Sequence, residues 1–269
     1  MTFANAVSGS GTVSVISTST LILPNANTYS GGTSMTSNGQ LILTNSTGSA
    51  LGSGTVTIGS ATPTSPYSGA TLGGSGSFAG QLGMTGGSNL YPVIFNSGAS
   101  TLTPSTLAAG SGATIAGNSS LIFLINNANG AVGTNWDQVT FAGSLSLTAT
   151  PSAPISISIN SVNGSFQAGQ ALNFDPTKAY SWQFVSAAGG ITGFDSTAFS
   201  ITTSALSAQT PGFANSLGAG SFYISETGND LFVNFTPIPE PSTWLLMGAG
   251  ILAIGAGAVA RGRICLARR

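Results

Sequence analysis

Side chains able to transfer protons or bind cations are few in this chain and widely spaced. The sequence has no histidine, six carboxylates and five tyrosines. The carboxylates that precede the C-terminal tail are Asp137, Asp175, Asp195, Glu226 and Asp230. A glycosidase needs two carboxylates facing one cleft, and no spacing here selects a pair. Because Asp often bonds its own backbone in turns, each acid is equally well explained as a turn residue.

The residues that a polysaccharide lyase or a metal site would need are also scarce. A polysaccharide lyase generally relies on a basic group, and the body of the chain offers only Lys178. Glu226, Asn229 and Asp230 could hold a weak Ca²⁺ ion through oxygen ligands, but the same run fits the loop of a hairpin. We therefore expect no catalytic, cofactor-binding or metal-binding residues, and the sequence predicts that the protein is not an enzyme.

The charges are unevenly distributed along the chain. Charged residues make up 4% of the sequence, against about 25% in an ordinary soluble domain, and residues 1–136 carry none. Before residue 261 there are six acids and one base, a net charge of 1 − 6 = −5. A body without a basic patch excludes nucleic-acid binding. With 41% apolar residues the chain can still bury a core.

The C-terminal tail reads as a membrane segment. The uncharged run Trp244 to Ala260 would form a helix of about 25 Å, at the short end of what crosses a bilayer. Four bases follow it at the chain end: Arg261, Arg263, Arg268 and Arg269. By the positive-inside rule these arginines form a cytoplasmic anchor and the body lies outside. The alternative, a buried core helix, is disfavoured by the terminal arginines and the all-round apolar surface.

Three features of this tail together resemble the PEP-CTERM sorting signal. They are the motif Pro239-Glu240-Pro241, the hydrophobic run 244–260 and the Arg-rich end 261–269. The resemblance implies an exosortase-type processing enzyme as partner, a Gram-negative bacterium, and transient anchoring in the inner membrane before delivery to the cell surface or extracellular matrix. Cys265 interrupts the arginines. We expect an inert thiol there, with lipidation as the alternative.

The N-terminal half contains short repeated motifs. TLIL at 20–23 returns as QLIL at 40–43, and GSGTVSV at 9–15 returns as GSGTVTI at 52–58. Related pieces are GATL at 69–72, GATI at 112–115 and SLIF at 120–123. A period near 20 residues is typical of solenoids, whose units must stack to bury an apolar face. An antiparallel sandwich is the alternative, and repetition of the motifs themselves favours the solenoid.

Residues 21–58 also resemble the autotransporter-associated β-strand repeat. The matching pieces are NTYSGGT at 27–33, GQL at 39–41 and ALGSGTV at 50–56. The resemblance implies a right-handed parallel β-helix. We therefore predict an all-β chain with a β-helix over 1–133, a β-rich terminal solenoid or cap region over 134–236, and a sorting tail over 237–269 with one transmembrane helix.

Aromatic residues and most charges gather in the second region. We expect strands there at 144–148, 155–159, 180–185, 199–203, 222–225 and 231–235. A hairpin loop at 226–230 joins the last two, and 190–195 reads as a turn. Trp136 and Trp182 are expected to pack in the core or cap, with a role as sugar-stacking platforms as the alternative.

These observations leave three functions open. The first is a structural protein of the envelope or matrix, which the sorting tail, the repeats and the missing chemistry favour. The second is an adhesin or polysaccharide-binding protein with exopolysaccharide as partner, which exposed aromatics in a row would favour. The third and least favoured is a carbohydrate-active enzyme. Because residues 1–7 do not resemble a secretion signal, we also expect that the start codon of the exported protein lies upstream of Met1, with a fragment of a longer protein as the alternative.

Overall fold

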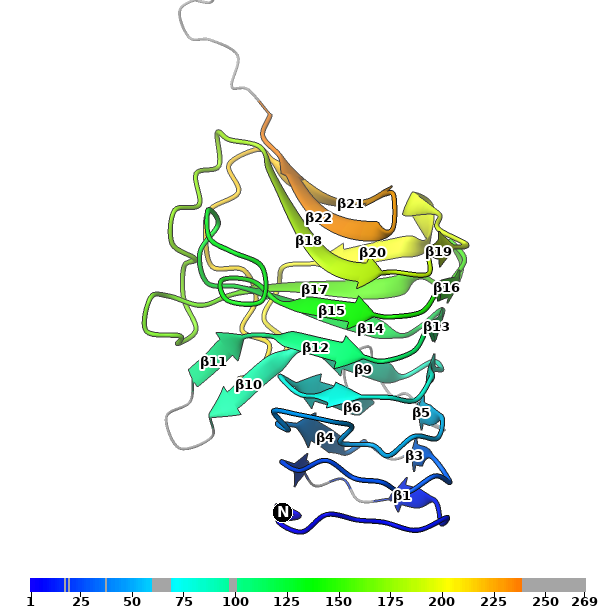
Figure 1. Ribbon diagram of the computed structural model, residues 1–269. Coiled ribbons are helices and arrows are strands. Elements are labelled where there is room, and N and C mark those ends of the chain that lie inside the picture. Colours follow the sequence, from blue (N-terminus) through cyan, green and yellow to red (C-terminus); the bar gives the residue numbers. More distant parts are fainter. Residues whose placement is uncertain (17, 19, 37, 60–68, 97–100, 239–269) are drawn as a thin grey trace, which may run out of the picture.

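The computed structural model describes residues 1–238 except 17, 19, 37, 60–68 and 97–100. Figure 1 shows a tapering stack of coils, with the N-terminus at one end and a hairpin at the other. Each coil visits up to three sheets in the same order. The described residues are almost all strand, turn or loop, with one short 3₁₀ helix, η1 (Ser196–Ala198).

Sheet 1 is built from seven short parallel strands, counted over the described residues: β1 (Val13–Val15), β3 (Thr33–Met35), β5 (Val56–Ile58), β8 (Leu82–Met84), β13 (Ala113–Ala116), β16 (Leu145–Thr148) and β19 (Ile191–Thr192). Side chains alternate between its two faces, as strand geometry requires. Met35, Ile58 and Ile115 point inward and are buried, whereas Ser34 and Thr57 point outward.

Sheet 2 follows in each coil and is also parallel throughout its seven described strands: β2 (Thr20–Leu23), β4 (Gln40–Leu43), β6 (Ala70–Gly74), β9 (Ser88–Tyr91), β14 (Ser120–Ile125), β17 (Ile155–Ser161) and β20 (Phe199–Thr202). One inward column runs through its whole height, from Leu21 through Leu41, Leu72, Leu90, Leu121 and Ile157 to Ile201. Stacking like residues in register buries the apolar face that one coil cannot bury alone.

Sheet 3 completes each coil, and its strand pairing changes from parallel to antiparallel at its last strands. Its parallel part is β7 (Ser77–Phe78), β12 (Thr106–Ala109), β15 (Gln138–Phe141) and β18 (Tyr180–Ala187). Two antiparallel strands then extend it, β22 (Asp230–Thr236) against β18 and β21 (Ser221–Thr227) against β22. A separate antiparallel hairpin, β10 (Val93–Asn96) and β11 (Thr101–Pro104), projects between sheets 2 and 3.

The outer face of sheet 2 is partly covered by a segment that we call the strap, residues 203–215. The Tyr91 hydroxyl donates to the Gln209 carbonyl at 2.7 Å, and the Gly212 amide donates to Asn160 Oδ1 at 2.9 Å. A small second core forms on this face from Tyr91, Val93, Leu102, Ile122, Leu124 and Val162. Outward residues of this sheet are therefore buried as well as inward ones.

The architecture confirms an all-β chain of stacked parallel strands, and the 20-residue repeat is the coil itself. Motif TLIL at 20–23 pairs in register with QLIL at 40–43, and the strands expected at 155–159, 180–185, 222–225 and 231–235 are all present. The handedness, the boundary at 133/134 and the autotransporter-type repeat stay predictions. One similarity was misleading: GATL at 69–72 belongs to sheet 2 and GATI at 112–115 to sheet 1, because local alternation is the same in both sheets.

Within the part of the chain that the structure describes, no helix has the length and apolar character to cross a membrane. The predicted transmembrane helix at 244–260 lies outside those residues, as do the sorting motif and the terminal arginines.

Candidate functional site

The first candidate residue, Asp137, lies inside the body. It stands where the excursion after β14 returns to β15, and only 1% of its surface is exposed. Its two carboxylate oxygens accept hydrogen bonds from the Ser105 and Leu124 amides, each at 3.1 Å. Burial raises the pKa of this carboxyl well above its usual range, and the two amide donors oppose that shift. Asp137 therefore joins neighbouring coils, whereas the sequence suggested a simple turn residue.

Asp175 and Asp195 each organise an exposed turn. Asp175 accepts from the amide and hydroxyl of Thr177, which lower its pKa, and it pairs with Lys178 at 3.4 Å. Asp195 caps η1, and the hydroxyl and amide of Thr197 lower its pKa in the same way. Both carboxylates therefore bond to residues two or three positions away within their own turn.

Glu226 and Asp230 lie on opposite faces of the terminal hairpin. Glu226 is directly opposite Leu231, and Thr227 is directly opposite Asp230. Neighbouring cross-strand pairs point to alternate faces of a sheet, so these two carboxylates do not converge on one ion. Among the described residues, no group of three or more His, Cys, Asp and Glu side chains is placed to hold a metal.

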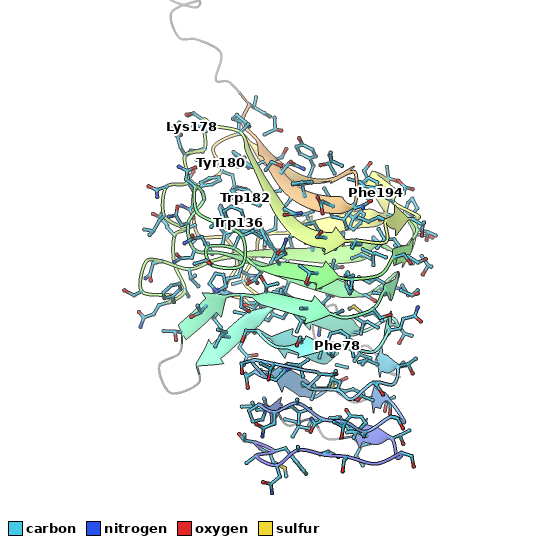
Figure 2. The ribbon with its side chains drawn as sticks, viewed as in Figure 1. Phe78, Trp136, Lys178, Tyr180, Trp182 and Phe194 are labelled. Atoms are coloured by element: carbon cyan, nitrogen blue, oxygen red, sulfur yellow. The ribbon has the colours of Figure 1, made fainter. Side chains whose placement is uncertain are left out.

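The aromatic residues of the second half mostly pack against one another. The Trp182 indole is 1% exposed, stacks on Tyr180 at 5.1 Å, and donates to the Ala128 carbonyl at 3.0 Å. Trp136 is half-buried and donates to the Gln183 carbonyl at 3.1 Å. Figure 2 shows these three rings on one side of the upper body, beside the terminal hairpin. This packing agrees with the expected role in the core and cap.

A shallow groove of about 590 Å³ crosses the outer face of sheet 3. Its floor is an outward row in which Ser77, Ala108, Thr140 and Ser186 pair from coil to coil. A second row, Ala79, Gly110, Ala142 and Ala188, follows each strand. Because these side chains are small while the inward Phe78 and Phe141 fill the core, the surface is hollowed along the solenoid axis.

Sequence reasoning did not find this groove. The signal that could have revealed it is the recurrence of a small residue at one outward position within each parallel strand of sheet 3, followed by Ala or Gly just after the strand. That signal becomes visible only once the pairing register is known, because irregular excursions separate those strands. The groove offers hydroxyl groups and apolar methyl groups, and its lining contains no charged residue.

The comparisons with known proteins concern the tail. A family model described as the PEP-CTERM protein-sorting motif matches residues 237–264. Comparison with curated proteins gives no match to the chain. The matched range contains the predicted motif Pro239-Glu240-Pro241 and the hydrophobic run 244–260. The chain therefore carries a PEP-CTERM sorting motif, which indicates a protein exported, processed by exosortase and directed to the cell surface.

Proposed function

We propose that residues 1–236 form a non-enzymatic structural protein of the cell surface or extracellular matrix, anchored in the inner membrane by the tail until exosortase processes it. The sorting motif at 237–264 carries this proposal. The residue roles within it, recognition by Pro239, Glu240 and Pro241, a membrane span at 244–260 and retention by Arg261, Arg263, Arg268 and Arg269, are part of the proposal.

The described body supports a structural role in two ways. Its described carboxylates stand on different elements, and three of them are occupied: Asp175 in a turn, Asp195 in a 3₁₀ cap and Asp137 in the buried contact between coils. Three of its large aromatic side chains, Trp182, Tyr29 and Tyr91, are buried and contribute to packing. They are therefore not exposed on the surface for stacking against a ligand.

Intact-mass analysis of the protein from inner membrane, outer membrane and medium tests the proposal. We expect the surface and medium fractions to lack the residues that follow the Pro-Glu-Pro motif, and the inner-membrane fraction to hold the full-length chain. The variant Glu240→Ala should accumulate at full length in the inner membrane. Thr236→Ala, just outside the matched range, is the matched control and should be processed normally.

A full-length tail confined to the inner membrane in the unmodified protein would mean that residues 244–260 are a permanent anchor and that exosortase does not act on this chain. If Glu240→Ala is processed at the normal rate, Glu240 is not needed for recognition, and the role proposed for the motif is wrong.

A second candidate, binding of a neutral exopolysaccharide, is favoured by the groove on sheet 3. Its floor presents the hydroxyls of Thr140 and Ser186 on neighbouring strands about 4.8 Å apart, whereas the Ser77 hydroxyl donates to the Gly48 carbonyl at 2.7 Å. The lining contains no charge that would select an ionic ligand.

Co-sedimentation of the protein with host exopolysaccharide tests this function. Ala108→Trp fills the groove and should lower retention at least tenfold if the groove binds, whereas Ser146→Trp on the outer face of sheet 1 should not. Equal retention of both variants by the exopolysaccharide would exclude the groove as the binding site.

A further inference from the structure

The strap, residues 203–215, joins coils of the body that are not neighbours. It follows β20, at the end of sheet 2, and turns back over the outer face of that sheet. Its side-chain contacts lie on β17, β9 and β4, whereas the hydrogen bonds within the sheet join neighbouring strands. From β17 to β4 the strap passes four strand spacings, a distance of about 19 Å.

The base of the strap is fixed to the later coils. The Ser161 amide donates to the Gly212 carbonyl at 2.9 Å, and the Ser161 hydroxyl accepts from the Ala214 amide at 2.8 Å. The Phe213 ring is buried in the main core and packs edge-to-face on Phe174, with the ring centroids 5.0 Å apart. The base of the strap is therefore part of the packed core under the terminal hairpin.

The tip of the strap is a tight turn that contacts two earlier strands. The Thr210 amide donates to the Ser207 carbonyl at 3.1 Å, and the two hydroxyls lie 2.8 Å apart. Gln209 lies in this turn. Its carbonyl accepts from the Tyr91 hydroxyl of β9, and its side-chain oxygen accepts from Gln40 Nε2 of β4, each at 2.7 Å. One residue of the tip thus bonds both strands.

The contact at Gln40 continues into the coil that contains β2. The Thr20 hydroxyl donates to Gln40 Oε1 at 3.0 Å, so Thr20, Gln40 and Gln209 form one chain of hydrogen bonds. Gln209 is 118 positions from Tyr91 and 169 positions from Gln40. Contacts of this sequence separation tie early coils to a segment that is rooted in the late ones.

Such a tie changes how a solenoid can open. The repeats of a solenoid ordinarily contact only their neighbours, so that one coil can open while distant coils stay folded. Here β4 and β9 are also bonded to the strap tip, whose base belongs to the core of the late coils. Opening of either strand therefore has to release the tip as well.

We propose that the strap is a clamp that couples the early coils of the body to the late ones. The clamp makes the stability of β4 depend on a hydrogen bond between the tip and β9, although β4 and β9 are separated by β6 in the sheet. This inference concerns the conformational stability of the body and stands apart from the surface function argued above.

Hydrogen exchange of the full-length chain in detergent micelles, followed by mass spectrometry, tests the clamp. Gln209→Ala removes the bond to Gln40 and keeps the carbonyl for Tyr91. We expect the amides of residues 40–43 to exchange about two- to tenfold faster, as loss of one hydrogen bond implies. Tyr91→Phe removes a hydroxyl that does not touch β4, and it should also speed exchange at 40–43 by about twofold or more, because it frees the tip.

Thr177→Ala is the matched control. It also removes one hydroxyl hydrogen bond, the one to Asp175 at 2.7 Å, but in an exposed turn that the strap does not touch. Exchange at residues 40–43 should stay unchanged in this variant. Circular dichroism verifies that the variants are folded. Because Gln209 is exposed, its variant keeps the test available if Tyr91→Phe fails to fold.

Unchanged exchange at residues 40–43 in either Gln209→Ala or Tyr91→Phe would overturn the proposal, since the tip could then detach without loosening β4. An equally large rise in Thr177→Ala would overturn it as well, because the effect would be a general loss of stability. Faster exchange in both strap variants, with no change in the control, is the result that the clamp requires.

Discussion

Asp137 shows how one carboxylate can hold two coils together at a cost that depends on pH. Its oxygens satisfy the Ser105 and Leu124 amides, and backbone donors buried without a partner are expensive. Burial opposes the charged form and raises the pKa of the group. The same environment raises the pKa of Tyr91, first through burial and then through the charge of Asp137.

The first prediction at this scale concerns Asp137→Asn. A carboxyl whose folded pKa is raised contributes stability that is complete below the unfolded pKa, about 3.9, and is lost as pH rises through the folded pKa. The amide does not titrate, and its NH₂ group cannot accept from a backbone donor. We expect the variant to be destabilised by about 1–3 kcal/mol at low pH, and the difference from the unmodified protein to narrow as pH rises.

Urea unfolding of both proteins at several pH values, followed by circular dichroism, measures that difference. Asp195→Asn, at an exposed cap, is the comparison variant. Its pKa is lowered in the folded protein, so its effect should change with pH in the opposite sense. A difference for Asp137→Asn that stays constant from about pH 4 to about pH 8 would contradict the account.

At the scale of elements, the coils depend on glycines where one chain segment passes close to another. Gly52 has φ +62°, and a Cβ there would lie 2.1 Å from the Tyr29 carbonyl oxygen of the coil below. Gly228, in the turn of the β21–β22 hairpin, has nearly the same φ of +63° and nothing within 4 Å of such a Cβ. Substitutions at Gly52 and Gly228 therefore share the same backbone strain, and only the one at Gly52 adds crowding between coils.

The corresponding prediction compares Gly52→Ala with Gly228→Ala. The hairpin variant should lose only the cost of a left-handed non-glycine residue, about 1–2 kcal/mol. The coil variant should lose that amount and about 1–3 kcal/mol more, because the Tyr29 main chain must move. Urea midpoints measure both losses, and equal destabilisation would show that the coils tolerate a side chain at this approach.

The two ends of the described body differ in structure. The first described coils have short strands, and the last coil has the long strand β18, against which the antiparallel hairpin β21–β22 pairs. Excursions become longer along the chain, so the small second core thickens the later coils. The strap reaches back to β4, where the Gln40 side chain donates to the Gln209 side chain at 2.7 Å. The hairpin thus closes the end of the body from which residue 237 leads into the sorting motif.

The sequence by itself determined the strand character, the stacking and the sorting tail. Alternation with period two decides which side chains face inward, and the return of LIL at 21–23 as LIL at 41–43 decides the register of β2 and β4, because both signals are local. The tail is recognisable for the same reason, since its motif, apolar run and arginines are contiguous.

Only the tertiary structure decided which sheet each later strand joins, where Asp137 lies, and that small residues on four coils line one groove. These features depend on contacts between residues far apart, such as Tyr91 and Gln209, 118 positions apart. Excursions of irregular length separate the later strands, so local alternation no longer fixes the register. The closure of the last coil by β21 and β22 likewise follows from tertiary pairing, since β22 pairs with the distant strand β18.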